Sequence, residues 1–253
     1  VGWSPMILLT GASGGIGKQL LPHLIQLDDI IGIYKSQKPS LIRTDEVDLK
    51  AKNSEETAGF DKRTSNTLDF VKLDITDSRD VSNFVKENTE RLTKITIVHL
   101  AGIKKDGLAA QYSEKDFDQA YDVNTKGVFL LTKALLPKMI NEKWGRVLSM
   151  TSHGGLEGDI GTIGYSSSKH ALLGVSRVLS KEYARFNITS NVIELGTFDT
   201  GMFQALPINV QKKILASIPT RKCGDVSNIA HAISFCIKAE YVNGAIIPVN
   251  GGI

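Results

Sequence analysis

The sequence has no run of about eighteen consecutive apolar residues, so it predicts no membrane-spanning helix. It has only two cysteines, Cys223 and Cys236, and neither belongs to a CxxC pair or stands beside paired histidines. Two such thiols fit a reducing compartment and predict no metal site. An excess of one charge is missing as well, because the net charge is +3 and lysines and glutamates are scattered along the chain. This pattern predicts no nucleic-acid surface.

The first residues, Val1 to Pro5, lack the basic stretch and following apolar stretch of a secretory signal, so we expect a soluble, cytoplasmic protein. What the chain does have is the composition of a globular protein. Of its 253 residues, 42% are hydrophobic and 23% are charged, enough to bury a sizeable core. No internal repeat and no domain boundary is visible, so we expect a single domain over residues 1–253.

Short apolar runs alternate with amphipathic stretches. The runs predicted as strands are Met6–Thr10, Ile30–Tyr34, Leu68–Leu73, Ile95–Leu100, Arg146–Met150, Thr189–Ile193 and Ala245–Val249. The stretches predicted as helices are Ile16–Leu27, Ser78–Arg91, Glu114–Ile140, Tyr165–Phe186 and Val226–Lys238, with N-caps at Ser113 and Asp225. This alternation predicts an α/β fold, a doubly wound parallel sheet of about seven strands with helices on both faces. Residues 36–67 are polar, and their sequence does not decide a structure.

A glycine-rich segment stands between the first predicted strand and the first predicted helix. It reads Thr10-Gly11-Ala12-Ser13-Gly14-Gly15-Ile16-Gly17. Glycines there permit a tight turn and let backbone N–H groups approach a pyrophosphate at the positive end of the helix. A plain glycine-rich turn is the alternative. The order strand, turn, helix favours nucleotide binding.

A second motif is Tyr165-Ser166-Ser167-Ser168-Lys169, with Ser152 upstream at the end of a predicted strand. Residues four apart on a helix lie on the same face, which brings Lys169 beneath the phenol of Tyr165. A nearby cation stabilises a tyrosinate and lowers the pKa of the phenol, as an acid–base catalyst requires. A solvated helix face that happens to carry a tyrosine and a lysine is the alternative.

Together, the glycine-rich turn, Ser152, the Tyr165–Lys169 motif and the segment Asn124-Thr125-Lys126-Gly127 resemble the short-chain dehydrogenase/reductase family over nearly the whole chain. The resemblance implies a Rossmann-type sheet, a nicotinamide cofactor and reversible carbonyl–alcohol chemistry. It implies that Tyr165 exchanges the proton and that Ser152 holds the substrate oxygen. Lys169 would tune the tyrosine and bind the nicotinamide ribose, and Asn124 would help to position a water of the proton relay.

Further positions match the family and would bind the cofactor. In the glycine-rich turn these are Thr10, Gly11, Ser13, Gly15, Ile16 and Gly17. Asp74 and Ile75 fall where the family contacts the adenine, although Asp74 could instead cap the next turn. Beyond the fourth predicted strand, Ala101 and Gly102 allow close approach of the backbone. Near the nicotinamide, the matching positions are Gly196 and Thr200.

Two segments depart from the family pattern. His99-Leu100-Ala101-Gly102 stands in place of Asn-Asn-Ala-Gly, so Leu100 cannot make the contacts of an asparagine amide. We expect His99 to be a core histidine with its hydrogen bonds satisfied. Leu195-Gly196 stands in place of Pro-Gly. These departures affect the cofactor geometry and leave the predicted catalytic set complete.

The end of the second predicted strand bears on the choice of dinucleotide. NAD-preferring members have an acidic residue there, which binds both ribose hydroxyls and repels a 2′-phosphate. This chain has Tyr34-Lys35-Ser36 instead. We predict NADPH over NADH, with NAD possible and reduction favoured in cells. Against this, Gly14 stands where many NADP users have an arginine, and Lys35 could be a solvated lysine.

Among subfamilies, the chain resembles the 3-oxoacyl-carrier-protein reductases and their paralogues. Lys143 is a plausible contact for an acidic carrier, but Phe186 stands where a second cation is expected, so we favour a small ketone or its alcohol as substrate. We expect a substrate pocket built by residues 153–163 and by an apolar lid over residues 198–218, which includes Met202, Phe203, Ala205 and Leu206.

The resemblance also implies a homodimer or homotetramer, paired through the two long predicted helices. Apolar positions on those helices that could serve an interface or the core are Phe129, Leu130, Leu172, Val175 and Leu179. A protein of this fold that binds the dinucleotide as a regulator or scaffold, without turnover, is the alternative function. Such proteins usually lack the tyrosine or the lysine, so we expect an enzyme.

Overall fold

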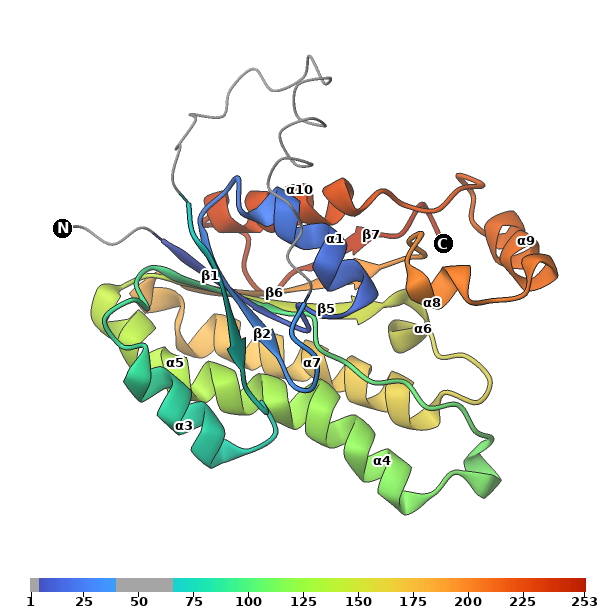
Figure 1. The fold of residues 1–253 in the computed structure, drawn as a ribbon, viewed down its shortest axis with the longest axis horizontal. Helices are drawn as coiled ribbons and strands as arrows, with labels where there is room; N and C mark the ends of the chain where they lie inside the picture. Colours follow the sequence, from blue (N-terminus) through green and yellow to red (C-terminus); the bar gives the residue numbers. More distant parts are fainter. Residues whose placement is uncertain (1–4, 40–65) are drawn as a thin grey trace, which may run out of the picture.

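The computed structural model describes residues 5–39 and 66–253 (Figure 1). Its centre is a seven-stranded sheet in the order β3-β2-β1-β4-β5-β6-β7, and every neighbouring pair is parallel. The strands are β1 (Met6–Thr10), β2 (Asp29–Tyr34), β3 (Leu68–Lys72), β4 (Ile95–His99), β5 (Gly145–Ser152), β6 (Ile188–Leu195) and β7 (Ile246–Val249). The order reverses between β1 and β4, the place where such sheets bind ligands. The predicted doubly wound parallel sheet is confirmed.

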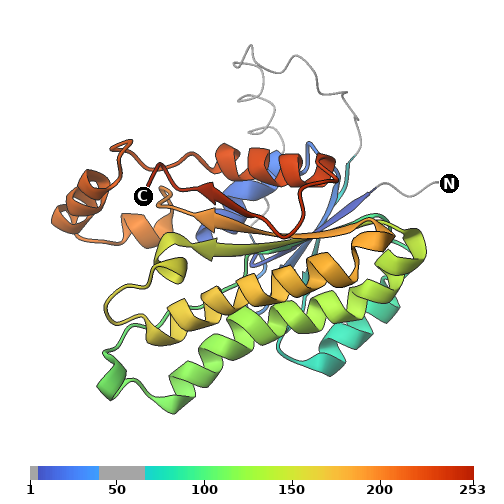
Figure 2. The ribbon, with the colours of Figure 1, turned by 180° about the vertical axis from the view of Figure 1, so that it is seen from behind.

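Helices cover both faces of the sheet (Figures 1 and 2). One face carries α1 (Gly15–Leu24) and α10 (Val226–Lys238), and the other carries α3 (Ser78–Glu87), α4 (Glu114–Tyr121), α5 (Gly127–Glu142) and α7 (Ile163–Glu182). Three short helices lie at the carboxyl end of the strands: α6 (His153–Leu156), α8 (Gly201–Gln204) and α9 (Ile208–Ser217). None of the described helices is both long and apolar enough to cross a membrane.

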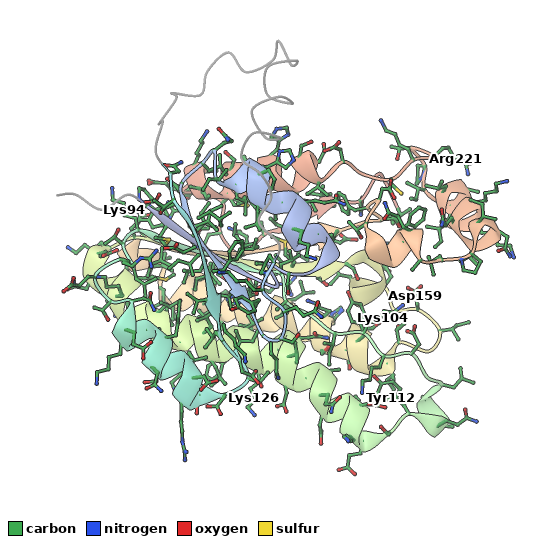
Figure 3. All side chains as sticks on the ribbon, viewed as in Figure 1. Lys94, Lys104, Tyr112, Lys126, Asp159 and Arg221 are labelled. Carbon is green, nitrogen blue, oxygen red and sulfur yellow. The ribbon has the colours of Figure 1, made fainter. Side chains whose placement is uncertain are left out.

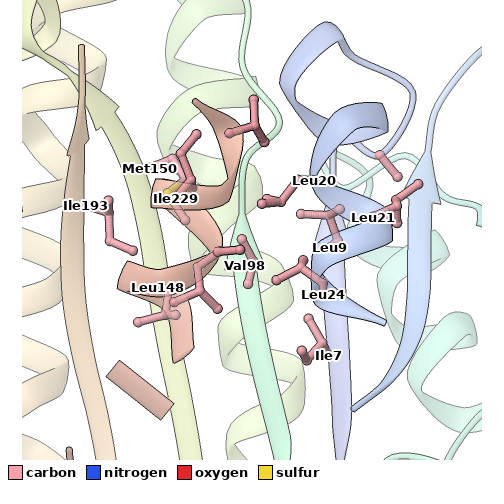
Figure 4. Close-up of a cluster of buried hydrophobic side chains, with 14 of the residues drawn as sticks. Ile7, Leu9, Leu20, Leu21, Leu24, Val98, Leu148, Met150, Ile193 and Ile229 are labelled. Atoms are coloured by element: carbon pink, nitrogen blue, oxygen red, sulfur yellow. The ribbon is translucent and has the colours of Figure 1, made fainter. Parts of the chain in front are cut away.

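Each face of the sheet has its own apolar core. Because side chains alternate along a strand, Ile7 and Leu9 of β1 pack toward α1 and α10, whereas Leu8 packs toward the opposite layer. Figure 4 shows the first core, with Leu20 of α1 and Ile229 of α10 packed over the sheet. Burial on both faces explains why the strands are apolar throughout.

The element boundaries differ from the predictions in a few places. The predicted helix Glu114–Ile140 is wrong as a single α-helix, because a π-helical turn over Asp122–Lys126 separates α4 from α5. The last predicted turn of the helix ending at Phe186 is a separate 3-10 turn, Ala184–Phe186. The sequence did not predict α6 or α8, because helices of four residues carry little periodicity, and it did not predict α9, which buries none of its residues. The predicted caps are confirmed, since the side chains of Ser113 and Asp225 accept hydrogen bonds from backbone N–H groups in the first turns of α4 and α10.

Two predictions lie wholly or largely outside the described residues. These are the absence of a signal in the first residues and the nature of the 36–67 segment. Thr67, at the end of that segment, is tied to the start of β2, because Asp29 accepts hydrogen bonds from its N–H and hydroxyl. This tie brings β2 and β3 into register.

Candidate active site

The glycine-rich turn joins β1 to α1. Gly11 has a φ of +72°, and a Cβ on Gly17 would collide with the carbonyl oxygen of Gly11, so the turn requires glycine at both positions. Gly14 is the N-cap of α1, and no side chain caps the helix. The leading N–H groups of a helix have no partners within it. Ser13 is partly exposed, while Gly14 and Gly15 are exposed. The N–H of Gly14 donates to the Gly11 carbonyl at 2.9 Å, so it is the N–H groups of the first turn of α1, from Gly15 on, that suit the pyrophosphate of a dinucleotide.

Thr10, predicted to contact the cofactor, has a hydroxyl that is already engaged by the protein. Its oxygen accepts hydrogen bonds from the N–H groups of Leu100 and Ala101, both at 3.1 Å. Thr10 thus ties the glycine-rich turn to the segment after β4. The two segments that the sequence assigned to the cofactor are held side by side at the point where the strand order reverses.

Ser152 and Tyr165 come together at the carboxyl end of β5. The Ser152 hydroxyl lies 2.9 Å from the Tyr165 hydroxyl, and it also accepts a hydrogen bond from the N–H of Gly155 at 3.0 Å. Ser152 is the last residue of β5 and the N-cap of α6, whereas Tyr165 lies in the first turn of α7. The strand and the helix therefore place two hydroxyl groups where they can share one substrate oxygen.

Lys169 lies one turn after Tyr165 on α7 and is buried, with 5% of its surface exposed. Its ammonium donates a hydrogen bond to the carbonyl of Met150 on β5 at 2.9 Å. Burial lowers the pKa of Lys169 from its usual 10.5 to about 8. An ammonium has three protons, and the Met150 carbonyl takes one of them.

Asn124 is fully buried in the π-helical turn. Its amide makes a pair of hydrogen bonds with the backbone N–H and carbonyl of Ile103, at 2.9 and 3.0 Å, and donates another to the Ser168 hydroxyl at 2.9 Å. Thr125 reinforces the contact with α7, since its hydroxyl donates to the Ser168 carbonyl. The Asn124 amide therefore holds the segment after β4 against the helix that carries Tyr165.

Gly102 lies between these groups. A Cβ at this position would come within 3.1 Å of the Lys169 ammonium and 3.2 Å of the Asn124 amide oxygen. Glycine thus leaves the space beside the buried ammonium open. This space and the first N–H groups of α1 both lie at the carboxyl end of the sheet, where sheets of this kind bind dinucleotides.

Lys35 and Asp74, both predicted cofactor contacts, pair with each other. The Lys35 ammonium lies 2.6 Å from one oxygen of Asp74, and the other oxygen accepts from the N–H and hydroxyl of Thr76. Burial raises the pKa of Asp74, but the bonds from Lys35 and Thr76 outweigh it and hold the pKa below its usual range. Tyr34 is half-buried beside the pair, and Ser36 is exposed. Asp74 also has the turn-capping contact that the sequence left open.

Residues 5–211 match the short chain dehydrogenase family. The chain belongs to this family. It is 33% identical to nodulation protein G of a Rhizobium species and to a 3-oxoacyl-[acyl-carrier-protein] reductase of Rickettsia bellii, each over 97% of this chain and 95% of the relative. It is 30% identical to an acetoacetyl-CoA reductase of an Acinetobacter species, over 97% of this chain and 96% of the relative.

This short-chain dehydrogenase, an oxidoreductase with a Rossmann-type nucleotide-binding fold, departs from our expectation at His99. The side chain is buried as predicted, and its Nε2 lies 2.9 Å from the Thr132 hydroxyl, but its Nδ1 has no partner among the described residues. The prediction of a fully satisfied histidine was therefore wrong for one nitrogen. Burial, and secondarily repulsion from Lys169, lowers the pKa of His99 to about 3.

The segment after β6 brings the other predicted cofactor contacts to the same end of the sheet. The N–H of Gly196 donates to the Val249 carbonyl at 3.0 Å. Thr200 is buried, and its N–H donates to the Phe198 carbonyl.

Two other predicted positions are buried. Ile75, predicted to contact the adenine, is buried in the core below α5 rather than open at the surface. Of the predicted lid residues, Phe203 is buried, and the side chain of Met202 lies outside the description.

A cavity of about 370 Å³ lies beside the first turn of α7. Its lining residues are Gly107, Ala109, Gly158, Asp159, Gly161, Thr162, Ile163, Ser166 and Ser167. The N–H of Gly107 donates to the Gly161 carbonyl at 2.8 Å, which joins the two loops around the cavity. Figure 3 shows Asp159 and Lys104 on these loops, at the opposite end of the molecule from Lys94.

Sequence reasoning missed several groups that shape the site. Ser168 lies inside the Tyr165–Lys169 motif, yet its contact with Asn124 depends on how α4 and α5 pack on α7. The backbone of Ile103 pairs with Asn124, and backbone groups leave no mark in a motif. His153 was placed in the predicted pocket segment 153–163, but its pairing with Glu194 of β6 was not predicted, because only the sheet register brings the two near.

Proposed function

We propose that this short-chain dehydrogenase interconverts a ketone and a secondary alcohol, with NADPH as its preferred cofactor and Tyr165 as the proton donor. The observation that carries the proposal is the 2.9 Å contact between the hydroxyls of Ser152 and Tyr165 at the carboxyl end of β5. When it is bound, the nicotinamide supplies or accepts the hydride. The protein binds the carbonyl oxygen and supplies the proton.

In the reduction, negative charge develops on the carbonyl oxygen. Ser152 accepts its hydrogen bond from Gly155, so its own proton is free to point at that oxygen. Tyr165 donates its proton to the same oxygen as the alcohol forms. In the reverse direction, the tyrosinate accepts the proton of the alcohol.

Lys169 lies one helical turn after Tyr165 and faces the same site. Since its pKa is about 8, the buried side chain is largely an ammonium at neutral pH. The Met150 carbonyl holds the ammonium in place on β5. The remaining protons would bind the nicotinamide ribose in the space beside Gly102.

The end of β2 supports NADPH over NADH. Tyr34-Lys35-Ser36 presents no carboxylate to the ribose hydroxyls. The Asp74 carboxylate already pairs with the Lys35 ammonium and offsets part of its charge, but 64% of the lysine side chain is exposed, so the ammonium can also reach a 2′-phosphate. A charge-assisted hydrogen bond contributes about 1.5–3 kcal/mol when buried. Because Lys35 is exposed, we expect a preference nearer tenfold than a hundredfold.

The proton donor is tested by Tyr165→Phe, with Tyr241→Phe as the matched control on a fully exposed ring. NADPH-dependent reduction should fall by about 100-fold or more in Tyr165→Phe, since a positioned acid contributes about 10²–10⁴-fold. The NADPH dissociation constant from fluorescence titration should stay unchanged in both variants. Full turnover by Tyr165→Phe would exclude the mechanism, and no wild-type turnover on any ketone would favour the non-catalytic reading.

The cofactor preference is tested by Lys35→Ala, with Lys38→Ala as the control on a neighbouring exposed lysine. We expect kcat/KM with NADPH to fall about tenfold in Lys35→Ala, with little change for NADH. Equal use of both cofactors by the wild type, or an unchanged ratio in Lys35→Ala, would remove Lys35 from the proposal.

We also propose that the protein associates through α5 and α7. Phe129 on α5 and Val178 on α7 are 49% and 53% exposed, whereas Leu172 is fully buried in the protein's own core. Exposed large apolar side chains on two helices of the same layer favour a homodimer or homotetramer. Light scattering at micromolar concentration should give a dimer or tetramer, and Phe129→Lys should shift it toward the monomer. A wild-type monomer would contradict the proposal.

A further inference from the structure

A histidine–glutamate pair begins at the residue that follows Ser152. The Nδ1 of His153 lies 3.2 Å from the Oε1 of Glu194, which also accepts from the Asn250 amide at 3.2 Å. Asn250 in turn donates to the Ile253 carbonyl at 2.9 Å. Glu194 pairs with Thr151 in the parallel register of β5 and β6, one position before Ser152. None of these side chains has a part in the proposed proton transfer.

The pair determines which ring nitrogen of His153 carries the proton. A carboxylate oxygen only accepts hydrogen bonds, so the Nδ1 of His153 must donate. In the neutral ring, Nε2 is then an acceptor. Nε2 has no partner among the described residues, and its bond directions diverge from those of Nδ1, so it points away from β6.

Burial and chain position indicate that this nitrogen is open at the end of β5 that carries Ser152. The Glu194 side chain is 12% exposed, whereas the His153 side chain is 36% exposed, so the edge that faces Glu194 is covered and the opposite edge is open. His153 follows Ser152 immediately, and adjacent Cα atoms are about 3.8 Å apart. The histidine therefore starts one residue from the hydroxyl that contacts Tyr165.

We propose that His153 is a specificity-determining residue, whose Nε2 accepts a hydrogen bond from a hydroxyl next to the substrate carbonyl. This inference rests on the proposed function and names the substrate class as hydroxy ketones. Glu194 and Asn250 hold the ring with its acceptor nitrogen outward. A ketone that has a methyl group in place of the hydroxyl leaves Nε2 without a hydrogen-bond partner. A second carbonyl in place of the hydroxyl can only accept hydrogen bonds, so it cannot donate one to Nε2.

The test compares two matched substrate pairs at about pH 8. Hydroxyacetone is paired with 2-butanone, and 2-hydroxycyclohexanone with 2-methylcyclohexanone, so that each pair differs only in a hydroxyl for a methyl. Ethyl acetoacetate represents a second carbonyl. The variants are His153→Leu, His153→Gln, which keeps an acceptor, and His170→Leu, a control on an exposed histidine of α7.

We expect the wild type to favour each hydroxy ketone about tenfold or more in kcat/KM. His153→Leu should lower kcat/KM for the hydroxy ketones about tenfold more than for the plain ketones. His153→Gln should recover part of the preference, and His170→Leu should keep the wild-type ratio. If His153→Leu fails to fold, the His153→Gln ratio and the wild-type preference still decide the question.

Several outcomes would overturn the inference. Equal losses on all ketones in His153→Leu would mean that the pair only ties α6 to β6. A wild-type preference for ethyl acetoacetate over both hydroxy ketones would assign the site to a second carbonyl. Equal turnover of the matched ketones by the wild type would overturn this inference and leave the proposed function standing. Absence of turnover on every ketone, despite NADPH binding, would overturn both this inference and the proposed function.

Discussion

Replacing Lys169 by methionine should make the protein more stable at neutral pH while it removes ketone reduction. Lys169 is the only lysine among the buried polar and charged residues described, with 5% of its surface exposed. Burial of its charge is unfavourable, which is why its pKa is about 8 instead of 10.5. Methionine has a similar length and no charge to bury.

The magnitude follows from the two pKa values. A difference of one pKa unit is about 1.4 kcal/mol, so the change from 10.5 to about 8 corresponds to about 3 kcal/mol. Methionine also leaves the Met150 carbonyl without the hydrogen bond it accepts from Lys169, which costs about 1 kcal/mol. The expected net gain in the free energy of unfolding is about 2 kcal/mol.

The gain should depend on pH in a definite direction. Below about pH 8, Lys169 is protonated in both states, and the full cost of burying its charge is present. Between about pH 8 and 10.5 the unfolded chain binds more protons than the folded protein, so the unfolding free energy of the wild type rises with pH. Lys169→Met has no such group, and its advantage fades over this window.

The assay is urea unfolding of both proteins at about pH 7 and about pH 9.5. The variant should be more stable by about 2 kcal/mol at the lower pH and nearly equal at the higher pH. Lys181→Met, on an exposed lysine of the same helix, should show neither effect. A variant less stable than the wild type at pH 7, or an advantage that does not change with pH, would refute the reasoning.

Three further outcomes are expected. Between about pH 7 and pH 5, the free energy of unfolding of the wild type should fall by about 2 kcal/mol more than that of His99→Gln, because the folded pKa of His99 of about 3 lies below the usual 6.5. Urea unfolding at both pH values measures this difference, and His231→Gln, on an exposed histidine, should match the wild type. Gly17→Ala should abolish NADPH binding and lower Tm, because a Cβ at Gly17 would collide with the Gly11 carbonyl oxygen, whereas Gly174→Ala on α7, which meets no atom of its own chain, should leave NADPH binding unchanged. Hydrogen exchange over residues 198–218, where α9 has no buried residue, should slow when cofactor and substrate bind; equal exchange would exclude a lid.

Local patterns in the sequence predicted the sheet, the glycine-rich turn and the Tyr165–Lys169 motif. The apolar runs predicted a parallel sheet because strands buried on both faces must be apolar throughout, as Ile7, Leu8 and Leu9 of β1 are. The glycine-rich turn and the Tyr165–Lys169 spacing were readable because a tight turn and a helical face each involve only neighbouring residues. Element ends were less certain, and the π-helical turn was missed because one extra residue per turn hardly changes an apolar period.

Tertiary structure alone decided how distant residues meet. Lys35 pairs with Asp74 because β2 and β3 lie side by side in the sheet, and His153 meets Glu194 because β5 and β6 do. Asn124 binds Ile103 and Ser168 only because α4 and α5 pack against α7. Such contacts depend on the order of the strands, their register and the packing of the helices. These are properties of the whole folded chain, and the spacing of neighbouring residues does not show them.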